Sequence, residues 1–97
     1  MIFRQGDVLI RKIDSLPKVK LSEVINGVLV YGEVTGHAHR IRGGKVYKHK
    51  DNMYLNVGKT ATIVHEEHKP IQLDRGYYSV IRQREYVSAD MIKVVTD

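Results

Sequence analysis

The clearest indication of the fold is the stretch Ser22-Glu23-Val24-Ile25-Asn26-Gly27-Val28-Leu29-Val30-Tyr31. Asn-Gly is a favoured pair for a two-residue turn, because both residues tolerate the left-handed conformation that a type I′ turn needs. Apolar and β-branched residues, which are common in strands, stand on both sides of the pair. The stretch therefore predicts a β-hairpin in which residues 22–25 pair with residues 28–31.

Turn residues separate short β-rich runs along the rest of the chain as well. Arg42-Gly43-Gly44-Lys45 predicts a second hairpin, between residues 39–41 and 46–48. Further strands are predicted at residues 8–13, 53–57, 60–64 and 77–87, while the last ten residues fit either a short helix or an edge strand. We expect residues 1–97 to form a single, mostly β domain: a small antiparallel barrel or sandwich of about six to eight short strands with little helix.

Composition limits the classes of protein to which the chain can belong. Its 97 residues, 42% of them hydrophobic, provide material for one modest core. The absence of cysteine excludes disulfides and thiolate zinc sites, and it makes a cytoplasmic location the default expectation. No apolar run approaches the length of a membrane span, so we expect no membrane partner.

The charge of the chain indicates what kind of molecule it binds. A net charge of +5 favours anionic partners, so we expect an anionic small molecule or a nucleotide, together with weak nucleic-acid binding. The basic residues are spread along the chain, and no helix-turn-helix, zinc-finger or ribonucleoprotein motif is present. This argues against sequence-specific DNA binding.

Four of the five histidines stand in two short clusters, Gly36-His37-Ala38-His39 and His65-Glu66-Glu67-His68. His37 and His39 would share one face of a strand, because side chains two residues apart point the same way. His65 and His68 are three apart, so only a bulge or a turn would bring them together. The two clusters together predict a divalent-metal site with His37, His39, His65 and His68 as candidate ligands.

The kind of metal and its chemistry stay open at this point. Imidazole ligands favour zinc, with iron, nickel or manganese as alternatives. Glu66 or Glu67 would serve as a catalytic base or as a further ligand. A metal-free acid–base site and a group of surface histidines are the other two interpretations of the same residues.

The predicted strand at residues 77–87 carries a second set of candidate residues. Side chains alternate between the two faces of a strand, so Arg82, Arg84 and Tyr86 would share one face. There the arginines could bind a phosphate and the tyrosine could stack on a base. Arg40, beside the first histidine cluster, adds positive charge. The structural alternative is that these arginines pair with carboxylates such as Asp7 across strands.

Four segments of the chain resemble a family of small, functionally uncharacterised proteins found in bacterial and phage genomes. They are residues 4–10, residues 32–39 with Gly36-His37-Ala38-His39, residues 65–71 with His65-Glu66-Glu67-His68, and Arg82-Gln83-Arg84-Glu85-Tyr86. The resemblance implies that the two histidine clusters act as one unit, and it implies no activity.

Three functions are consistent with these residues. The first is a β-barrel-like protein whose histidine-bound metal ion hydrolyses an anionic, phosphate-bearing substrate. The second is a non-catalytic protein that sequesters a nucleotide or a nucleic-acid segment. The third is a protein-interaction module whose edge strands pair with a partner or with a second copy, which would give a homo-oligomer.

Overall fold

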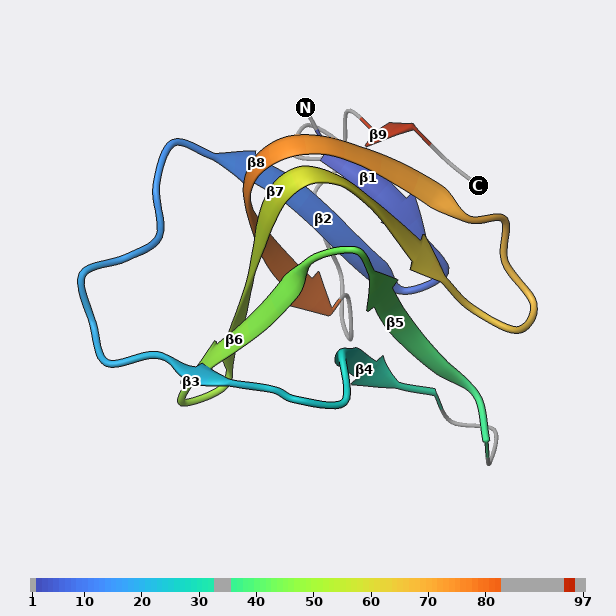
Figure 1. Ribbon diagram of the computed structural model, residues 1–97. Helices are drawn as coiled ribbons and strands as arrows, with labels where there is room; N and C mark the ends of the chain where they lie inside the picture. Colours follow the sequence, from blue (N-terminus) through green and yellow to red (C-terminus); the bar gives the residue numbers. More distant parts are fainter. Residues whose placement is uncertain (1, 33–35, 83–93, 96–97) are drawn as a thin grey trace.

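The computed structural model describes residues 2–32, 36–82 and 94–95, and every regular element within them is a β-strand. In chain order the strands are β1 (Ile2–Gln5), β2 (Val8–Ile13), β3 (Ser22–Glu23), β4 (Val28–Tyr31), β5 (Ala38–Arg42), β6 (Lys45–His49), β7 (Asn52–Val64), β8 (Ile71–Arg82) and β9 (Val94–Val95) (Figure 1). The prediction of a mostly β domain is confirmed. No helix among the described residues has the length and apolar character that a membrane crossing requires.

The strands form one sheet in the order β3-β6-β7-β8-β2-β1-β9, and a branch adds β5 and then β4 beside the second half of β7. Strands β1 to β8 pair antiparallel, and β9 runs parallel to β1. The sheet bends back on itself without closing into a barrel. The predicted antiparallel β class is thus confirmed. Of the two predicted architectures, barrel or sandwich, the closed barrel does not form.

The hairpin predicted at Asn26-Gly27 is wrong, because β3 pairs with β6 and β4 pairs with β5. The turn instead closes between Val24 O and Gly27 N, at 3.2 Å, and Asn26 Oδ1 accepts the Val28 amide at 3.1 Å. It carries the chain from the edge of β6 to the edge of β5. This crossing buries the apolar residues at the start of β4, whereas β3 stays exposed.

The hairpin predicted at Arg42-Gly43-Gly44-Lys45 is wrong as well. Strands β5 and β6 lie one after the other along the same edge of β7, where Arg42 faces Thr62 and Lys45 faces Asn56. The glycine pair provides an irregular link between two strands that run in the same direction, instead of a reversal. This arrangement buries Ile41 and Val46 in the same core.

Three neighbouring segments change direction at glycine residues, and this bend gives the sheet its shape. Gly43 joins β5 to β6, Gly58 lies in β7 next to a register shift between Val57 and Thr60, and Gly76 lies in β8 opposite Val57. All three segments arch over together in Figure 1. The strands predicted at residues 53–57 and 60–64 are therefore one bent strand. The strand predicted at residues 77–87 begins earlier, at Ile71, and its residues 83–87 lie outside the described part of the chain.

The inner side of the bend holds a single hydrophobic core. Its most deeply buried side chains include Val8, Ile10, Leu55, Ile63 and Leu73, each at most 1% exposed. Burying a side chain of this size contributes roughly 1.5–3 kcal/mol. Tyr78 is also buried in this core, and its hydroxyl donates to Asp74 O at 2.7 Å. Burial raises the pKa of Tyr78, and Asp74 adds to the shift.

The bend predicts different effects for two glycine substitutions. Gly43 has a φ of +90°, and an added Cβ would lie 2.8 Å from Thr60 O. We therefore expect Gly43→Ala to lower the free energy of unfolding by about 1–3 kcal/mol in urea denaturation. Gly58→Ala is the matched control, since its Cβ would meet nothing within 4 Å, and it should change stability by about 0.5 kcal/mol or less. Equal effects of the two substitutions would contradict a role for Gly43 in the bend.

Candidate metal centre

The two histidine clusters lie side by side because of the register between β5 and β7. Arg40 faces Val64 in this pair, so the residues just before β5 and just after β7 leave the sheet together. His39 lies in β5 and is 2% exposed, while His65 and His68 lie in the segment between β7 and β8. Antiparallel pairing thus joins two segments that are far apart in the sequence.

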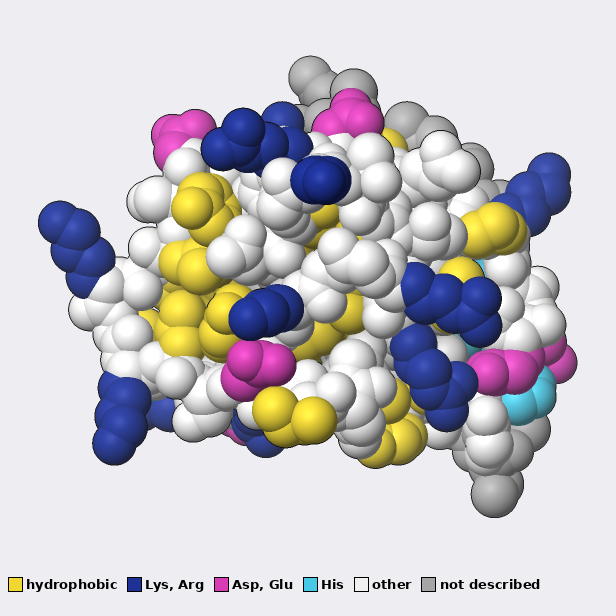
Figure 2. All heavy atoms as spheres, viewed as in Figure 1, with side chains coloured by type: hydrophobic (Ala, Val, Ile, Leu, Met, Phe, Trp, Pro, Cys, Tyr) yellow, Lys and Arg dark blue, Asp and Glu magenta, His cyan; other side chains and the backbone are white. Residues whose placement is uncertain are grey.

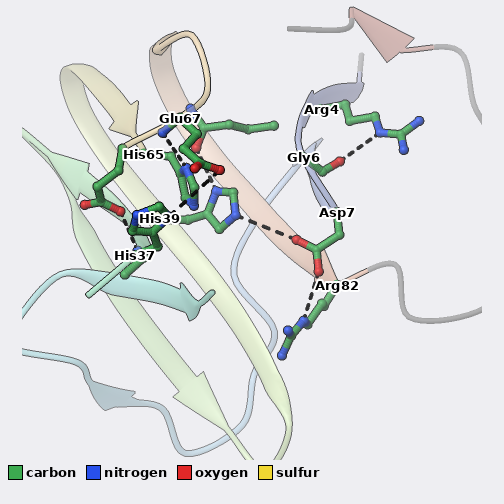
Figure 3. A network of polar contacts seen from close by, with 11 residues as sticks. Arg4, Gly6, Asp7, His37, His39, His65, Glu67 and Arg82 are labelled. Carbon is green, nitrogen blue, oxygen red and sulfur yellow. Dashed lines mark hydrogen bonds and ion pairs between the residues drawn. The ribbon is translucent and has the colours of Figure 1, made fainter. Parts of the chain in front are cut away.

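The four imidazole rings form one contiguous group around His65, and Figure 3 shows His37, His39 and His65 together. The ring centroid of His65 lies 5.6 Å from that of His37, 4.3 Å from that of His39 and 4.7 Å from that of His68. His39 and His68 stack with centroids 6.1 Å apart and ring planes 14° apart. The proximity that the sequence predicted is present, while the role of the rings as metal ligands stays a prediction.

Gln5 fixes the orientation of His39. The Gln5 side chain is 0% exposed, and its Nε2 donates to Ile63 O at 3.1 Å and to Lys69 O at 2.8 Å. Its Oε1 therefore faces His39 Nδ1, at 2.8 Å, and an amide oxygen can only accept. The proton of His39 must then reside on Nδ1. A histidine that donates from Nδ1 to a carbonyl is oriented in the way that metal-binding histidines commonly are.

The turn between β1 and β2 closes one side of the histidine group. Gly6 has a φ of +60°, and an added Cβ would lie 2.7 Å from His68 Nε2, so only glycine allows the ring to pack here. Asp7 follows in the same turn, with Oδ1 3.7 Å from His39 Nε2. Its other oxygen accepts from Arg82 Nε at 3.1 Å, so Asp7 lies between His39 and Arg82 (Figure 3).

The two glutamates of the second cluster have different surroundings. Glu66 accepts the Ala38 amide at 2.7 Å with one oxygen and Arg40 Nη1 at 3.0 Å with the other. The Ala38 amide, with help from Arg40, lowers the pKa of Glu66, which makes this carboxylate a weak base. The Glu67 side chain is 65% exposed, and its Oε2 lies 3.9 Å from His37 Nδ1. Glu67 is therefore better placed to accept a proton from a bound molecule.

One group of residues has spacing suited to a metal ion. Ligand atoms of His37, His65 and Glu66 all lie within 4.8 Å of one another. Ligands of a tetrahedral zinc ion lie roughly 3.3 Å apart, so modest side-chain rotations would complete the geometry. His65 Nδ1 now accepts the Glu67 amide at 3.0 Å, and metal binding through this atom would replace that hydrogen bond.

An open depression of about 280 Å³ lies over the histidine group. The residues that line it are Asp7, Gly32, His37, His39, His65, Glu67 and His68. Of the two glutamates, Glu66 lies within ligand distance of His37 and His65, whereas Glu67 lines the depression, as Asp7 does. The two glutamates therefore suit different tasks, a ligand and a base.

The arginines predicted to bind phosphate already contact carboxylates. Arg40 pairs with Glu66, and Arg82 pairs with Asp7. Figure 2 shows basic side chains spread over one face, with basic, acidic and histidine side chains together at its right. Arg84 and Tyr86, predicted for the same task, lie outside the described residues. The binding of phosphate by these residues stays a prediction.

Sequence reasoning missed Gln5, and it named Asp7 only as a carboxylate that could pair with the arginines, a pairing that Arg82 makes. Gln5 ends β1 and Asp7 lies in the β1–β2 turn, and both stand more than 30 positions before His39 in the chain. Their importance comes from how the turn packs against the histidines, and no local pattern of residue types indicates that. The only signal was that residues 4–10 belong to the segments that resemble a known family.

A comparison with protein families gives one result. The model of a family described as Domain of unknown function (DUF8820) matches residues 4–83. The chain belongs to this family. The DUF8820 match covers the β1–β2 turn and both histidine clusters, and it confirms the expectation of an uncharacterised family. Bacterial or phage occurrence stays a prediction.

Two further comparisons bear on the DUF8820 chain. No curated protein matches it, and no solved structure matches it.

The contacts of Gln5 predict a large effect of one substitution. Gln5→Leu would remove its hydrogen bonds to the buried Ile63 O, to the part-buried Lys69 O and to His39 Nδ1, so we expect the free energy of unfolding in urea to fall by about 2–4 kcal/mol. Gln72→Leu, on the exposed side of β8, is the matched control and should change stability by about 0.5 kcal/mol or less. Nitrogen NMR of the imidazoles should also show that His39 loses its fixed Nδ1–H form. An unchanged His39 spectrum in Gln5→Leu would contradict this assignment.

Proposed function

We propose that this protein binds a divalent metal ion, zinc in the first place, between His37, His65 and Glu66. The observation that carries the proposal is that ligand atoms of these three residues lie within 4.8 Å of one another. Two imidazoles and one carboxylate form a common ligand set of catalytic zinc sites. Glu66 would be supported as a ligand by the hydrogen bonds that it accepts from the Ala38 amide and from Arg40.

The remaining histidines supply a further ligand. His39 holds its proton on Nδ1, so in the neutral ring its Nε2 carries the lone pair that a metal requires. His39 and His68 line the same depression as His37 and His65, and their rings are packed against His65. Either ring would complete the coordination if it turned toward the ion, while iron, nickel or manganese would use the same imidazoles.

The chemistry proposed for this centre is hydrolysis of an anionic, phosphate-bearing substrate. The depression is open to solvent and Glu67 lines it, so water could reach a metal ion bound there, and the ion would lower the pKa of that water. Glu67 would accept the proton as the water attacks. The net charge of +5 favours the approach of an anion, and Arg82 and Arg40 lie at the borders of the centre.

Metal content tests the binding step. The untagged protein, loaded with zinc and dialysed, should retain about one ion per chain by plasma mass spectrometry. His37→Ala and His65→Ala should each weaken zinc affinity by at least about tenfold in competition with a chromophoric chelator. His49→Ala is the matched control, because His49 lies in β6 and contacts Lys20 O at 3.0 Å instead. If no zinc, iron, nickel or manganese is retained by the wild type, the proposal is wrong.

A second experiment tests catalysis separately from binding. We expect the zinc-loaded protein to hydrolyse p-nitrophenyl phosphate, and Glu67→Gln to lower kcat by about 10²–10⁴-fold while keeping the metal. Glu23→Gln, on the exposed strand β3, should leave the rate unchanged. Metal binding without any turnover would exclude hydrolysis of this ester and favour the non-catalytic binding function.

A further inference from the structure

A second cavity, of about 360 Å³, lies next to the histidine group. It is bordered by β4 on one side and by the β6–β7 turn and the end of β8 on the other. Buried apolar residues, among them Val28, Leu29 and Val80, form much of its lining. A cavity of this size that combines apolar side chains with several polar and charged groups is suited to a small polar molecule.

An exposed tyrosine stands at the border of this cavity. Tyr31 is 63% exposed, yet its hydroxyl accepts from Asn26 Nδ2 at 3.1 Å, which restrains the ring. Both residues line the cavity. A restrained, solvent-accessible ring is suited to stack on a planar group, and such stacking on a base contributes about 1–3 kcal/mol.

One charged group of the cavity, Arg82, connects it to the histidine depression. Arg82 lines the cavity, and its ion pair with Asp7 links it to the depression, which Asp7 lines. Tyr31 and Gly32, adjacent in the chain, line the cavity and the depression respectively. Within the described part of the chain, Arg82 uses its Nε–H for Asp7, and a guanidinium has further N–H donors.

We infer that the two neighbouring cavities together bind a nucleoside monophosphate. The base lies in the cavity against Tyr31 and its apolar neighbours, and the phosphate lies at Arg82, facing the histidine depression. Lys48 and Asp51 in the same lining offer a donor and an acceptor for the polar edge of the base. The inference rests on the proposed function for the role of the metal, but the binding of the base and of the phosphate at Arg82 does not require it.

Calorimetric titration of the full chain with AMP, GMP, CMP and UMP tests this inference. We expect at least one monophosphate to bind, and to bind more tightly than its nucleoside. Tyr31→Ala should weaken that binding by about fivefold or more, and Arg82→Gln should remove the preference for the monophosphate over the nucleoside. Tyr77→Ala and Arg11→Gln, which change exposed residues outside the cavity, are the matched controls and should bind like the wild type.

Two results of these titrations would contradict the inference of a nucleotide site. If none of the four monophosphates binds at millimolar concentration, or if Tyr31→Ala and Arg82→Gln both bind like the wild type, the inference is wrong. Circular dichroism of each variant shows that a loss of binding does not come from unfolding.

Repeating the titration with a chelator and with His37→Ala separates this inference from the proposed metal site. Nucleotide binding that survives both treatments while zinc is not retained supports the cavity and overturns the metal site. Zinc retention without nucleotide binding supports the metal site and overturns the inference of a nucleotide site.

Discussion

The bend shared by three neighbouring segments is the constraint on which the rest of this structure depends. Because β7 and β8 are long and change direction near Gly58 and Gly76, one sheet can enclose a core from two sides. The bend also places the end of β7 and the start of β5 at the same margin as the β1–β2 turn. The histidine group lies at this margin, so its position follows from the curvature of the sheet.

The sequence predicted the β class correctly but not the partners of its strands. Residue types indicate which local backbone conformation is preferred. Asn26-Gly27 does form a turn, and Gly43-Gly44 does interrupt a strand. Strand pairing depends on contacts with residues that are distant in the sequence. Val28 and Leu29 are buried beside β5, while Ser22 and Glu23 remain exposed. Turn chemistry alone cannot distinguish a reversal from a link between two strands on one edge.

The histidines of the candidate centre could be predicted from the sequence, because clustered histidines are uncommon. Gln5 could not, because glutamine is common and its role depends on where it lies in the fold. Histidines in two clusters stand out in any sequence of this length. Gln5 acquires its role only because the β1–β2 turn packs against His39, Ile63 and Lys69. Glu66 and Glu67, equivalent in the sequence, differ in the structure because only Glu66 meets the Ala38 amide and Arg40.

The β1–β2 turn also has a consequence for the order in which the protein folds. Gln5 contacts Lys69 across 64 positions, and Asp7 contacts Arg82 across 75. Contacts of such sequence separation close large loops and slow the search for the native state. Gln5 and Asp7 can make these contacts only when Lys69 and Arg82 are in place, so we expect the turn to pack against the histidines late in folding. In the native state, local opening of this short segment would expose His39 to solvent exchange while the bent sheet stays intact.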